Sequence, residues 1–419
     1  MSKPKIRFKG FIEDWEQRKL DDVAKFTKGT GYSKGDLVDS GTPIILYGRL
    51  YTNYETTIRD VDTFVVEKEN SVFSRGGEVI VPASGETAED IARASAVENA
   101  GVLLGGDLNI IETGENINSS FLALTISNGN SQKELAKKAQ GKSVVHIRND
   151  EIKRVLISLP TKVEQDKIAI YFDKLDTLIT LHQRKCDETK KLKKYMLQKM
   201  FPQNGKNIPE IRFDGFTEDW EQCKFKNIFD YLQNNTLSRA GLSEEGSVFN
   251  VHYGDVLIKF GEVIDIQRDR LPSIFDESVL GKYQSSVLQN GDIIIADAAE
   301  DETVGKCSEI KGITNEKVLA GLHTIPVRPK KKYAMGFMGY YMNSNAYHNQ
   351  LLPLMQGTKV SSISKSAIQE TDVLFPKNEG EQQKIGAYFQ SLDHFITLHQ
   401  QKYEELQKIK KFMLQNMFI

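Results

Sequence analysis

Two blocks of sequence occur twice in this chain, in the same order in each half. The first, the opening block, reads IRFKGFIEDWEQRKL at Ile6–Leu20 and IRFDGFTEDWEQCKF at Ile211–Phe225, with about 11 of 15 positions identical. The second, the closing block, covers Glu164–Phe201 and Glu381–Phe418, with about 23 of 38 positions identical. Repetition at this level predicts one structural plan that is used twice.

The lead-in to each closing block repeats as well. It reads Gly141-Lys142-Ser143-Val144, Ile147, Ile152, Pro160 and Glu164-Gln165 in the first copy, and Gly357-Thr358-Lys359-Val360, Ile363, Ile368, Pro376 and Glu381-Gln382 in the second. The variable regions between the blocks, 21–140 and 226–356, show little similarity to each other. A common frame with different contents is expected of two modules that share a scaffold and recognise different things.

Apolar side chains in the closing blocks recur with alternating spacings of three and four residues, which is typical of a heptad seam. The seam residues are Ile168, Phe172, Leu175 and Ile179 in the first copy and Ile385, Phe389, Leu392 and Ile396 in the second. Each block is long enough for a helix of about 36 residues, or roughly 54 Å. One such helix alone would leave its seam in water, so we expect the two helices to pack together, antiparallel, around a pseudo-two-fold axis.

Two polar features of the closing blocks have more than one interpretation. His182 and His399 occupy equivalent seam positions, where a histidine can fix the register of the helices or act as a proton switch; the first interpretation is favoured. The basic run 184–194 is suited to DNA phosphates, but Asp187 and Glu188 interrupt it. A solvated face or a surface for an acidic partner is equally compatible with that pattern.

The variable regions are expected to be mixed and β-rich. Short apolar runs flanked by turn residues predict strands that enter turns at 42–48, 77–82, 251–258 and 291–296. Loops near these runs carry side chains that can pair with base edges, since Arg and Lys pair with guanine, Asn with adenine, and Thr contacts the thymine methyl group. The candidate DNA-binding residues are Lys28, Thr30, Tyr32, Lys34, Tyr47, Arg49, Tyr51, Thr52, Asn53, Asn234, Asn235, Ser238, Arg239, Tyr253, Lys259 and Lys359.

Composition excludes several classes of protein. The net charge of −2 argues against a protein that coats nucleic acid non-specifically, because such binding depends on many phosphate contacts. The three cysteines, Cys186, Cys223 and Cys307, are odd in number and far apart, which favours reduced thiols over a disulfide or a metal site. No apolar run approaches the ~18 residues of a membrane span, and the N-terminus lacks the features of a signal peptide, so we expect a cytoplasmic protein.

Sequence motifs for catalysis are incomplete. There is no Asn-Pro-Pro-aromatic or Asp-Pro-Pro-aromatic tetrad of an amino-methyltransferase, no His-Glu-x-x-His and no nucleophile elbow. The stretch 26–31 only loosely resembles a glycine-rich cofactor loop, and Gly141-Lys142-Ser143 lacks the first glycine of a P-loop, since position 136 is Ala. The Glu-x-Lys at Glu151–Lys153 has no evident acidic partner, so an exposed helix face is favoured over a nuclease site. We therefore expect a chain without a catalytic or metal site.

Taken together, these motifs make the whole chain similar to specificity subunits of type I restriction-modification systems. The resemblance rests on the doubled organisation, the Gly…Ile…Ile…Pro…Glu-Gln lead-in, the Ile-Arg-Phe-x-Gly-Phe-x-x-x-Trp opening, and the phrase Ala320-Gly321-Leu322-His323-Thr324. It implies an α+β fold in which two pseudo-symmetric target-recognition domains are separated by two long antiparallel coiled-coil helices. The implied boundaries are 1–160 and 205–376 for the recognition domains, and 161–204 and 377–419 for the segments with the long helices.

The resemblance also implies a function. Each recognition domain would read one half of a split, asymmetric site in double-stranded DNA, and the helices would set the number of unread bases between the halves. The repeats would dock two modification subunits, which methylate adenine N6 with S-adenosylmethionine after base flipping. Restriction subunits that use ATP and Mg²⁺ would join them, and this chain itself would hold no cofactor. Two alternatives remain: a self-contained methyltransferase or nuclease, and a scaffold whose variable regions bind peptides.

Overall fold

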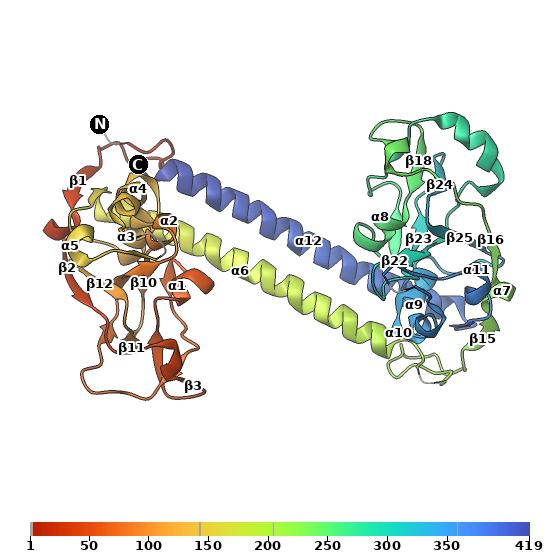
Figure 1. Cartoon of the computed structure of the whole chain (residues 1–419), viewed down its shortest axis with the longest axis horizontal. Helices are drawn as coiled ribbons and strands as arrows, with labels where there is room; N and C mark the ends of the chain where they lie inside the picture. The colour runs from red at the N-terminus through yellow and green to blue at the C-terminus, as the bar shows by residue number, and fades with distance from the viewer. Residues whose placement is uncertain (1–2, 142–143, 204, 358) are drawn as a thin grey trace. The chain divides into compact units, whose positions relative to one another are not determined.

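The computed structural model describes residues 3–141, 144–203, 205–357 and 359–419. The chain divides into two compact units: unit 1 comprises residues 1–183 and 400–419, and unit 2 comprises residues 184–399. Both units combine mixed β-sheets with helices, and both contain parts of two long helices, α6 (Lys162–Lys199) and α12 (Glu379–Met417) (Figure 1). The α+β fold and the long helices expected from the sequence are confirmed.

Unit 1 contains two main sheets and two short strand pairs. One sheet has the order β2-β12-β8-β10-β5, the other the order β3-β6-β4-β11-β7, and β1 pairs with β14 and β9 with β13. The strands are β1 Glu16–Lys19, β2 Ala24–Lys28, β3 Leu37–Val38, β4 Thr42–Ile45, β5 Thr57–Ile58, β6 Phe64–Val65, β7 Phe73–Arg75, β8 Glu78–Pro82, β9 Ser84–Gly85, β10 Ser95–Val97, β11 Ala100–Leu104, β12 Leu108–Thr113, β13 Val145–His146 and β14 Leu156–Leu159. The shorter helices are α1 Arg49–Thr52, α2 Ala88–Ile91, α3 Ser119–Ile126, α4 Gly129–Lys138 and α5 Asn149–Ile152.

Unit 2 is built in the same way. Its sheets have the orders β16-β25-β21-β23-β19 and β17-β20-β18-β24, with β15 paired to β27 and β22 to β26. The strands are β15 Glu221–Lys224, β16 Phe229–Tyr231, β17 Leu242–Ser243, β18 Val248–Val251, β19 Val263–Asp265, β20 Ser273–Ile274, β21 Ile293–Ala296, β22 Ala298–Ala299, β23 Cys307–Lys311, β24 Lys317–Ala320, β25 Thr324–Pro329, β26 Ser361–Ser362 and β27 Asp372–Phe375. The shorter helices are α7 Phe225–Ile228, α8 Tyr253–Ile258, α9 Phe337–Asn343, α10 Asn345–His348 and α11 Lys365–Ile368.

The variable regions share their topology although their sequences differ. In the first sheet of unit 1, β10 and β5 are parallel and the other neighbouring pairs are antiparallel. In the first sheet of unit 2, β23 and β19 are likewise parallel and the other neighbouring pairs antiparallel. In the second sheet, β4 runs parallel to β11 in unit 1, and β18 runs parallel to β24 in unit 2. Topology is therefore preserved in the variable regions by the burial of apolar side chains, without identity of those side chains.

The opening block is tied to the closing block by a buried ion pair. Arg7 donates two hydrogen bonds to the Glu164 carboxylate, at 2.6 and 2.7 Å, and Arg212 donates two to Glu381, at 2.7 and 2.8 Å. The side chains of Glu164 and Glu381 are 0% and 1% exposed. Both glutamates lie in the first turn of a long helix, so each pair joins the start of that helix to the opening block of its unit.

The glutamine that follows each of these glutamates has a structural role too. The Gln165 amide donates to the carbonyl of Pro160 and its oxygen accepts from the Asn118 backbone N–H. The Gln382 amide donates to the carbonyl of Pro376 and its oxygen accepts from the Ala334 N–H. The repeated Glu-Gln is thus explained by local hydrogen bonding at the start of each long helix.

Within each unit, the parts of α6 and α12 run antiparallel. In unit 1 the Phe172 ring lies 5.8 Å from the Phe418 ring, and Asp176, one turn later, pairs with Lys410. In unit 2 the Phe389 ring lies 5.7 Å from Phe201, and Asp393 pairs with Lys193 at 2.6 Å. In both units the residue numbers rise along one helix as they fall along the other, which is the antiparallel packing that the sequence predicts.

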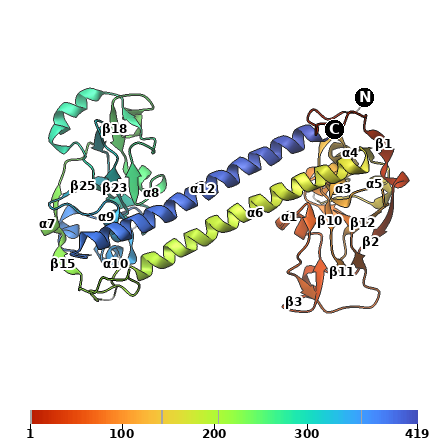
Figure 2. The ribbon, with the colours of Figure 1, turned by 180° about the vertical axis from the view of Figure 1, so that it is seen from behind.

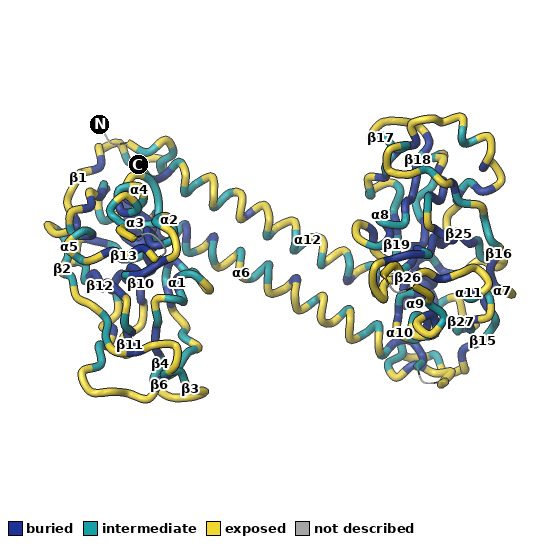
Figure 3. Tube along the Cα trace, in the orientation of Figure 1, coloured by how far each residue is buried: buried dark blue, intermediate teal, exposed yellow. Residues whose placement is uncertain are grey.

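The seam residues lie at these contacts, but they do more than join the two helices. Ile168, Phe172 and Leu175 are buried in one cluster with Phe121 and Leu124 of α3. Figure 2 shows α3 close to the first part of α6. Correspondingly, Ile385, Phe389 and Leu392 pack in unit 2 with aromatic residues of α9, while Ile179 and Ile396 are half-buried. Burial along the long helices is concentrated where they meet the core of a unit, as Figure 3 shows.

Each core is completed by a phenylalanine that ends one of the long helices. Phe201 follows α6 and is 1% exposed in unit 2, where its ring lies 6.2 Å from those of both Trp220 and Phe337. Phe418 follows α12 and is 6% exposed in unit 1, with its ring 6.0 Å from Phe121. The helix that begins in one unit therefore ends in the core of the other.

One expected strand is largely a helix. The prediction of a strand at 251–258 is wrong, because β18 ends at Val251 and residues 253–258 form α8. The side chain of His252 accepts a hydrogen bond from the Gly254 N–H and so caps the helix. The strands expected at 42–48, 77–82 and 291–296 are found as β4, β8 and β21.

Other residues singled out in the sequence have ordinary surroundings. Glu151 accepts a hydrogen bond from the Arg148 N–H at the start of α5, and Lys153 pairs with Asp150 on an exposed face. Cys186 and Cys307 are buried and Cys223 is half-buried. His182 and His399 are half-buried on α6 and α12, and Lys142 and Ser143 lie outside the described residues.

Loss of the buried ion pair should destabilise the unit that contains it. Arg7→Ala leaves the Glu164 carboxylate buried without its guanidinium, which we expect to cost about 3–5 kcal/mol. Hydrogen exchange of the α3 amides would measure the effect on unit 1. Arg18→Ala, which removes an exposed pair with Glu16, should leave that exchange nearly unchanged. Equal exchange in both variants would contradict the assigned role of Arg7.

Truncation of the phenylalanine after each long helix should affect only the unit that receives it. Phe418→Ala should reduce the stability of unit 1 by about 3–5 kcal/mol, and Phe201→Ala that of unit 2 by a similar amount. The separate exchange rates of α3 and α9 would assign each loss to its unit. Phe412→Ala, at a side chain that is 56% exposed, is the control and should change neither rate.

Candidate nucleic-acid interface

In each unit the chain passes from one sheet to the other through a tight corner. Residues 105–107 connect β11 to β12 in unit 1, and residues 321–323 connect β24 to β25 in unit 2. The last residue of each corner has a left-handed backbone, with φ of 57° at Asp107 and 53° at His323. Both side chains are exposed, while the flanking strands are buried.

Equivalent backbone hydrogen bonds hold the two corners in place. In unit 1, Ala83 N donates to Asp107 O (2.7 Å), Gly105 N to Ile45 O (2.9 Å) and Thr30 N to Leu104 O (3.1 Å). The equivalent bonds in unit 2, in the same order, run from Asp297 N to His323 O (3.1 Å), from Gly321 N to Val251 O (2.8 Å) and from Asn235 N to Ala320 O (2.8 Å). The corners are therefore fixed by neighbours from three other segments, not by their own sequence alone.

The lead-in to each closing block lies next to the corner. Ile147 N donates to the carbonyl of Ala83, and Ile363 N to that of Asp297. β13 and β26, which precede these residues, pair with β9 and β22. The exposed Lys359 is brought to this edge, whereas Thr358 lies outside the described residues.

The candidate residues of unit 1 fall into two groups. Lys28, Lys34, Tyr47, Thr52 and Asn53 are exposed, and Thr30 is half-buried with its hydroxyl donating to the carbonyl of Asn70. Tyr32, Arg49 and Tyr51 already make hydrogen bonds or ion pairs within unit 1. The exposed group presents cationic, aromatic and amide side chains of the types that contact DNA.

Tyr32, Arg49 and Tyr51 support the loops that carry the exposed group. The Tyr32 hydroxyl contacts the Ser71 hydroxyl at 2.6 Å, and the Tyr51 hydroxyl donates to the carbonyl of Ser84 at 2.7 Å. The Arg49 guanidinium, 11% exposed, pairs with Glu55 and Asp62 at 2.9 and 2.6 Å. In this arrangement Arg49 holds the segment after α1 and does not face solvent.

The candidate residues of unit 2 divide in the same way. Ser238, Arg239, Lys259 and Lys359 are exposed. Asn234 and Tyr253 are half-buried, and the Asn234 amide donates to the carbonyl of Gly321. Asn235 is 1% exposed, and its amide donates to Asn250 Oδ1 at 2.7 Å and to the carbonyl of Ala320 at 2.9 Å. Its contacts make Asn235 a support of the corner.

Two charged pairs organise the edge of unit 2. Arg239 donates two hydrogen bonds, at 3.0 and 2.8 Å, to Asp255 in the first turn of α8. His323 Nδ1 lies 3.2 Å from Asp297 Oδ1, and the His323 ring meets the Tyr253 ring edge-on at 5.2 Å. Burial raises the pKa of Asp297 above its usual value, and the charge of His323 opposes that shift.

Sequence reasoning did not propose Asp107, His323 or His146 as site residues, although the phrase that contains His323 was part of the family resemblance. His146 Nδ1 lies 3.0 Å from the Ser84 hydroxyl. A signal for the corner exists in the sequence. Gly105-Gly106-Asp107 and Gly321-Leu322-His323 each precede a run of apolar residues, and Asp and His tolerate the left-handed conformation better than most residues. The alignment of these two short phrases becomes evident only once both strands are known.

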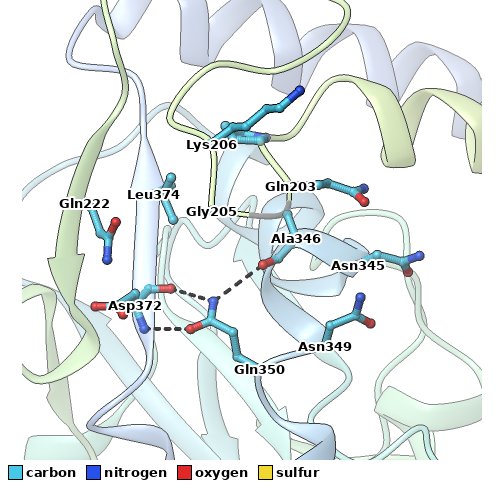
Figure 4. Close-up of a pocket in the computed structure, with 11 residues that line it drawn as sticks. Gln203, Gly205, Lys206, Gln222, Asn345, Ala346, Asn349, Gln350, Asp372 and Leu374 are labelled. Atoms are coloured by element: carbon cyan, nitrogen blue, oxygen red, sulfur yellow. Dashed lines mark hydrogen bonds between the residues drawn. The ribbon is translucent and has the colours of Figure 1, made fainter.

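A pocket in unit 2 involves none of the candidate residues. It has a volume of about 310 Å³, and several amide side chains line it, including Gln203, Asn345 and Asn349 (Figure 4). Gln350 donates to the carbonyl of Asp372 and accepts from the Asp372 N–H, both at 2.9 Å. These bonds fasten the segment after α10 to β27.

The described parts of the chain contain neither a membrane-spanning helix nor a cluster of metal-binding side chains. None of the helices there combines the length and apolar character needed to cross a membrane. Within the same residues, no group of three or more His, Cys, Asp or Glu is arranged to hold a metal ion.

Comparison with known proteins identifies the family. A family model described as the type I restriction modification DNA specificity domain matches residues 12–191 and 217–408. The chain is 23% identical over 411 residues to the type I restriction enzyme MjaVIII specificity subunit of Methanocaldococcus jannaschii, covering 95% of this chain and 91% of that protein. It is also 23% identical over 420 residues to the putative MjaX specificity subunit of the same organism, with the same coverage.

A solved structure has the same fold. The S subunit of the type I restriction-modification system from M. genitalium aligns with a TM-score of 0.57 at 14% sequence identity, covering 100% of this chain and 99% of that one. The two matches to the family model coincide with the two copies of the plan found in the sequence. The chain therefore belongs to the specificity subunits of type I restriction-modification systems, a non-catalytic family whose DNA specificity domain it carries twice.

Proposed function

We propose that unit 1 and unit 2 each read one half of a split, asymmetric site in double-stranded DNA. The observation that carries this proposal is the shared corner, where one backbone framework presents different side chains in the two units. Thr30 of unit 1 corresponds to Asn235 of unit 2, and Arg49 to Asp255. Because the frame is common and its contents differ, the two half-sites should have different sequences.

In this proposal the recognition domains are residues 1–160 and 205–376, and the candidate residues divide their work. Lys28, Lys34, Lys259 and Lys359 contact phosphates or guanine, and Tyr47, Thr52, Asn53, Ser238 and Tyr253 lie at base edges or the backbone. Tyr32, Arg49, Tyr51, Asn234, Asn235 and Arg239, with Thr30, position the loops that carry them. The overall charge of −2 fits binding that depends on a local set of contacts.

The segments with the long helices, 161–204 and 377–419, are proposed to fix the number of unread base pairs. α6 and α12 are 38 and 39 residues long, and each contributes residues to both units. A continuous helix does not change its length, so it can act as a ruler. We expect half-sites about ten base pairs apart, centre to centre, so that both are read from the same face of the duplex.

The same segments are proposed to dock two modification subunits, which restriction subunits then join. Adenine methylation with S-adenosylmethionine, and DNA translocation with ATP and Mg²⁺, would take place on those partners. Exposed apolar side chains on the long helices, such as Ile170 and Leu178, support a docking surface there.

Methylation mapping tests the proposal directly. The chain is co-expressed with its modification subunit in a host without adenine methylation, and N6-methyladenine is mapped across the genome. We expect a two-part asymmetric motif with a fixed gap. Replacing residues 226–356 with the variable region of another family member should change one half of the motif only. A stable complex with the modification subunit that adds no methylation would refute the recognition function.

The proposed phosphate contacts have a separate test in the salt dependence of binding. Lys34→Gln should weaken binding of the assembled complex to all sequences alike, and should reduce the log–log slope of affinity against salt by about 1. Lys9→Gln, at an exposed lysine of the opening block, is the matched control. A slope that changes equally in both variants would remove Lys34 from the interface.

A further inference from the structure

Three residues other than glycine have a left-handed backbone among the described residues: Asn70, Asp107 and His323. Asp107 and His323 are each the last residue of the corner of their unit, although the variable regions around them differ in sequence. A left-handed conformation strains the backbone of a residue other than glycine, and a glycine would remove that strain. A side chain is nevertheless present at both corners, which points to a use for that side chain.

The two side chains stand on a rigid base. The residues on either side of each corner, Leu104 and Leu108 in unit 1 and Ala320 and Thr324 in unit 2, are at most 1% exposed. Each corner is further held by backbone hydrogen bonds from neighbouring segments, among them those donated by Ala83 and Asp297. A side chain that must distinguish one base from another by hydrogen bonding needs support of this kind, since small displacements weaken the bonds.

The chemistry of the two side chains is opposite. The Asp107 carboxylate only accepts hydrogen bonds, and its charge repels phosphates. It suits the amino groups that cytosine and adenine present in the major groove. The His323 ring is exposed, is oriented by Asp297 at 3.2 Å, and lies against Tyr253. Because Nδ1 faces Asp297, Nε2 is the ring nitrogen left for a base edge, and a ring with protons on both nitrogens would donate from Nε2 to guanine O6 or N7.

We propose that Asp107 and His323 are base-reading residues, with Asp107 accepting from an amino group in one half-site and His323 donating to a purine or thymine acceptor in the other. This inference rests on the proposed function, and it adds the residue and the hydrogen-bond polarity in each half. It also explains why neither position is a glycine.

The experiment uses the full chain with its modification subunit and compares methylation motifs. His323→Gly and Asp107→Gly remove the side chain and relieve the backbone strain, so the variants should be at least as heat-stable as the original chain. We expect each to relax one position in one half-site, lowering base discrimination there by about 5- to 150-fold, while the other half is unchanged. Asn70→Gly relieves similar strain at a residue outside 105–107, keeps the carbonyl that accepts from Thr30, and should leave the motif intact.

Polarity is tested by Asp107→Asn and His323→Asp. Asn retains the left-handed conformation but adds donors, so it should shift the preferred base at one position of the first half-site. His323→Asp should exchange an acceptor base for one with an amino group in the second. A two-part motif that both glycine variants leave unchanged would overturn this inference alone. Absence of any two-part motif with the original chain would overturn the proposed function, and this inference with it.

Discussion

The buried pairing of one arginine with one glutamate, made once in each unit, is the constraint on which the rest of the molecule depends. Arg7 with Glu164 and Arg212 with Glu381 fix the first turn of each long helix against the opening block. The antiparallel pairs β1 with β14 and β15 with β27 carry the same connection through the backbone. The direction of each helix as it leaves its unit is thereby set by groups that are distant in sequence and identical in both copies.

Around this anchor, the variable regions are free to change. Among the described strands, both keep the same order, except that β7 at the edge of the second sheet of unit 1 has no counterpart in unit 2. The order is kept because the central strands need only apolar side chains of suitable size, such as Ile80 and Ile294. Loops at the corner carry the differences, because they are exposed and held at their ends. The molecule separates a part that stays constant, where the long helices join the opening blocks, from a part that can vary without loss of the fold.

Much of this organisation could be predicted from the sequence. The common framework of the two units could be predicted because its parts are repeated or periodic in the sequence. These parts are the repeated Glu-Gln, the seam from Ile168 to Ile179, and the apolar runs that become β4, β8 and β21. The helix α8 was mistaken for a strand, since its start depends on a cap by His252 that apolar patterning does not reveal. The supporting roles of Arg49 and Asn235 depend on partners up to 85 residues away, and sequence spacing gives no access to them.

The exchanged phenylalanines have a consequence for the order in which the chain can fold during synthesis. Unit 2 is one continuous segment, 184–399, so it can close as soon as that segment has left the ribosome. Unit 1 has nearly all of its sheets much earlier, yet Phe172 and Phe121 lack a neighbour until Phe418 is made. The half that is translated first is therefore the half that matures last, and its incomplete apolar surface is exposed throughout the synthesis of the other.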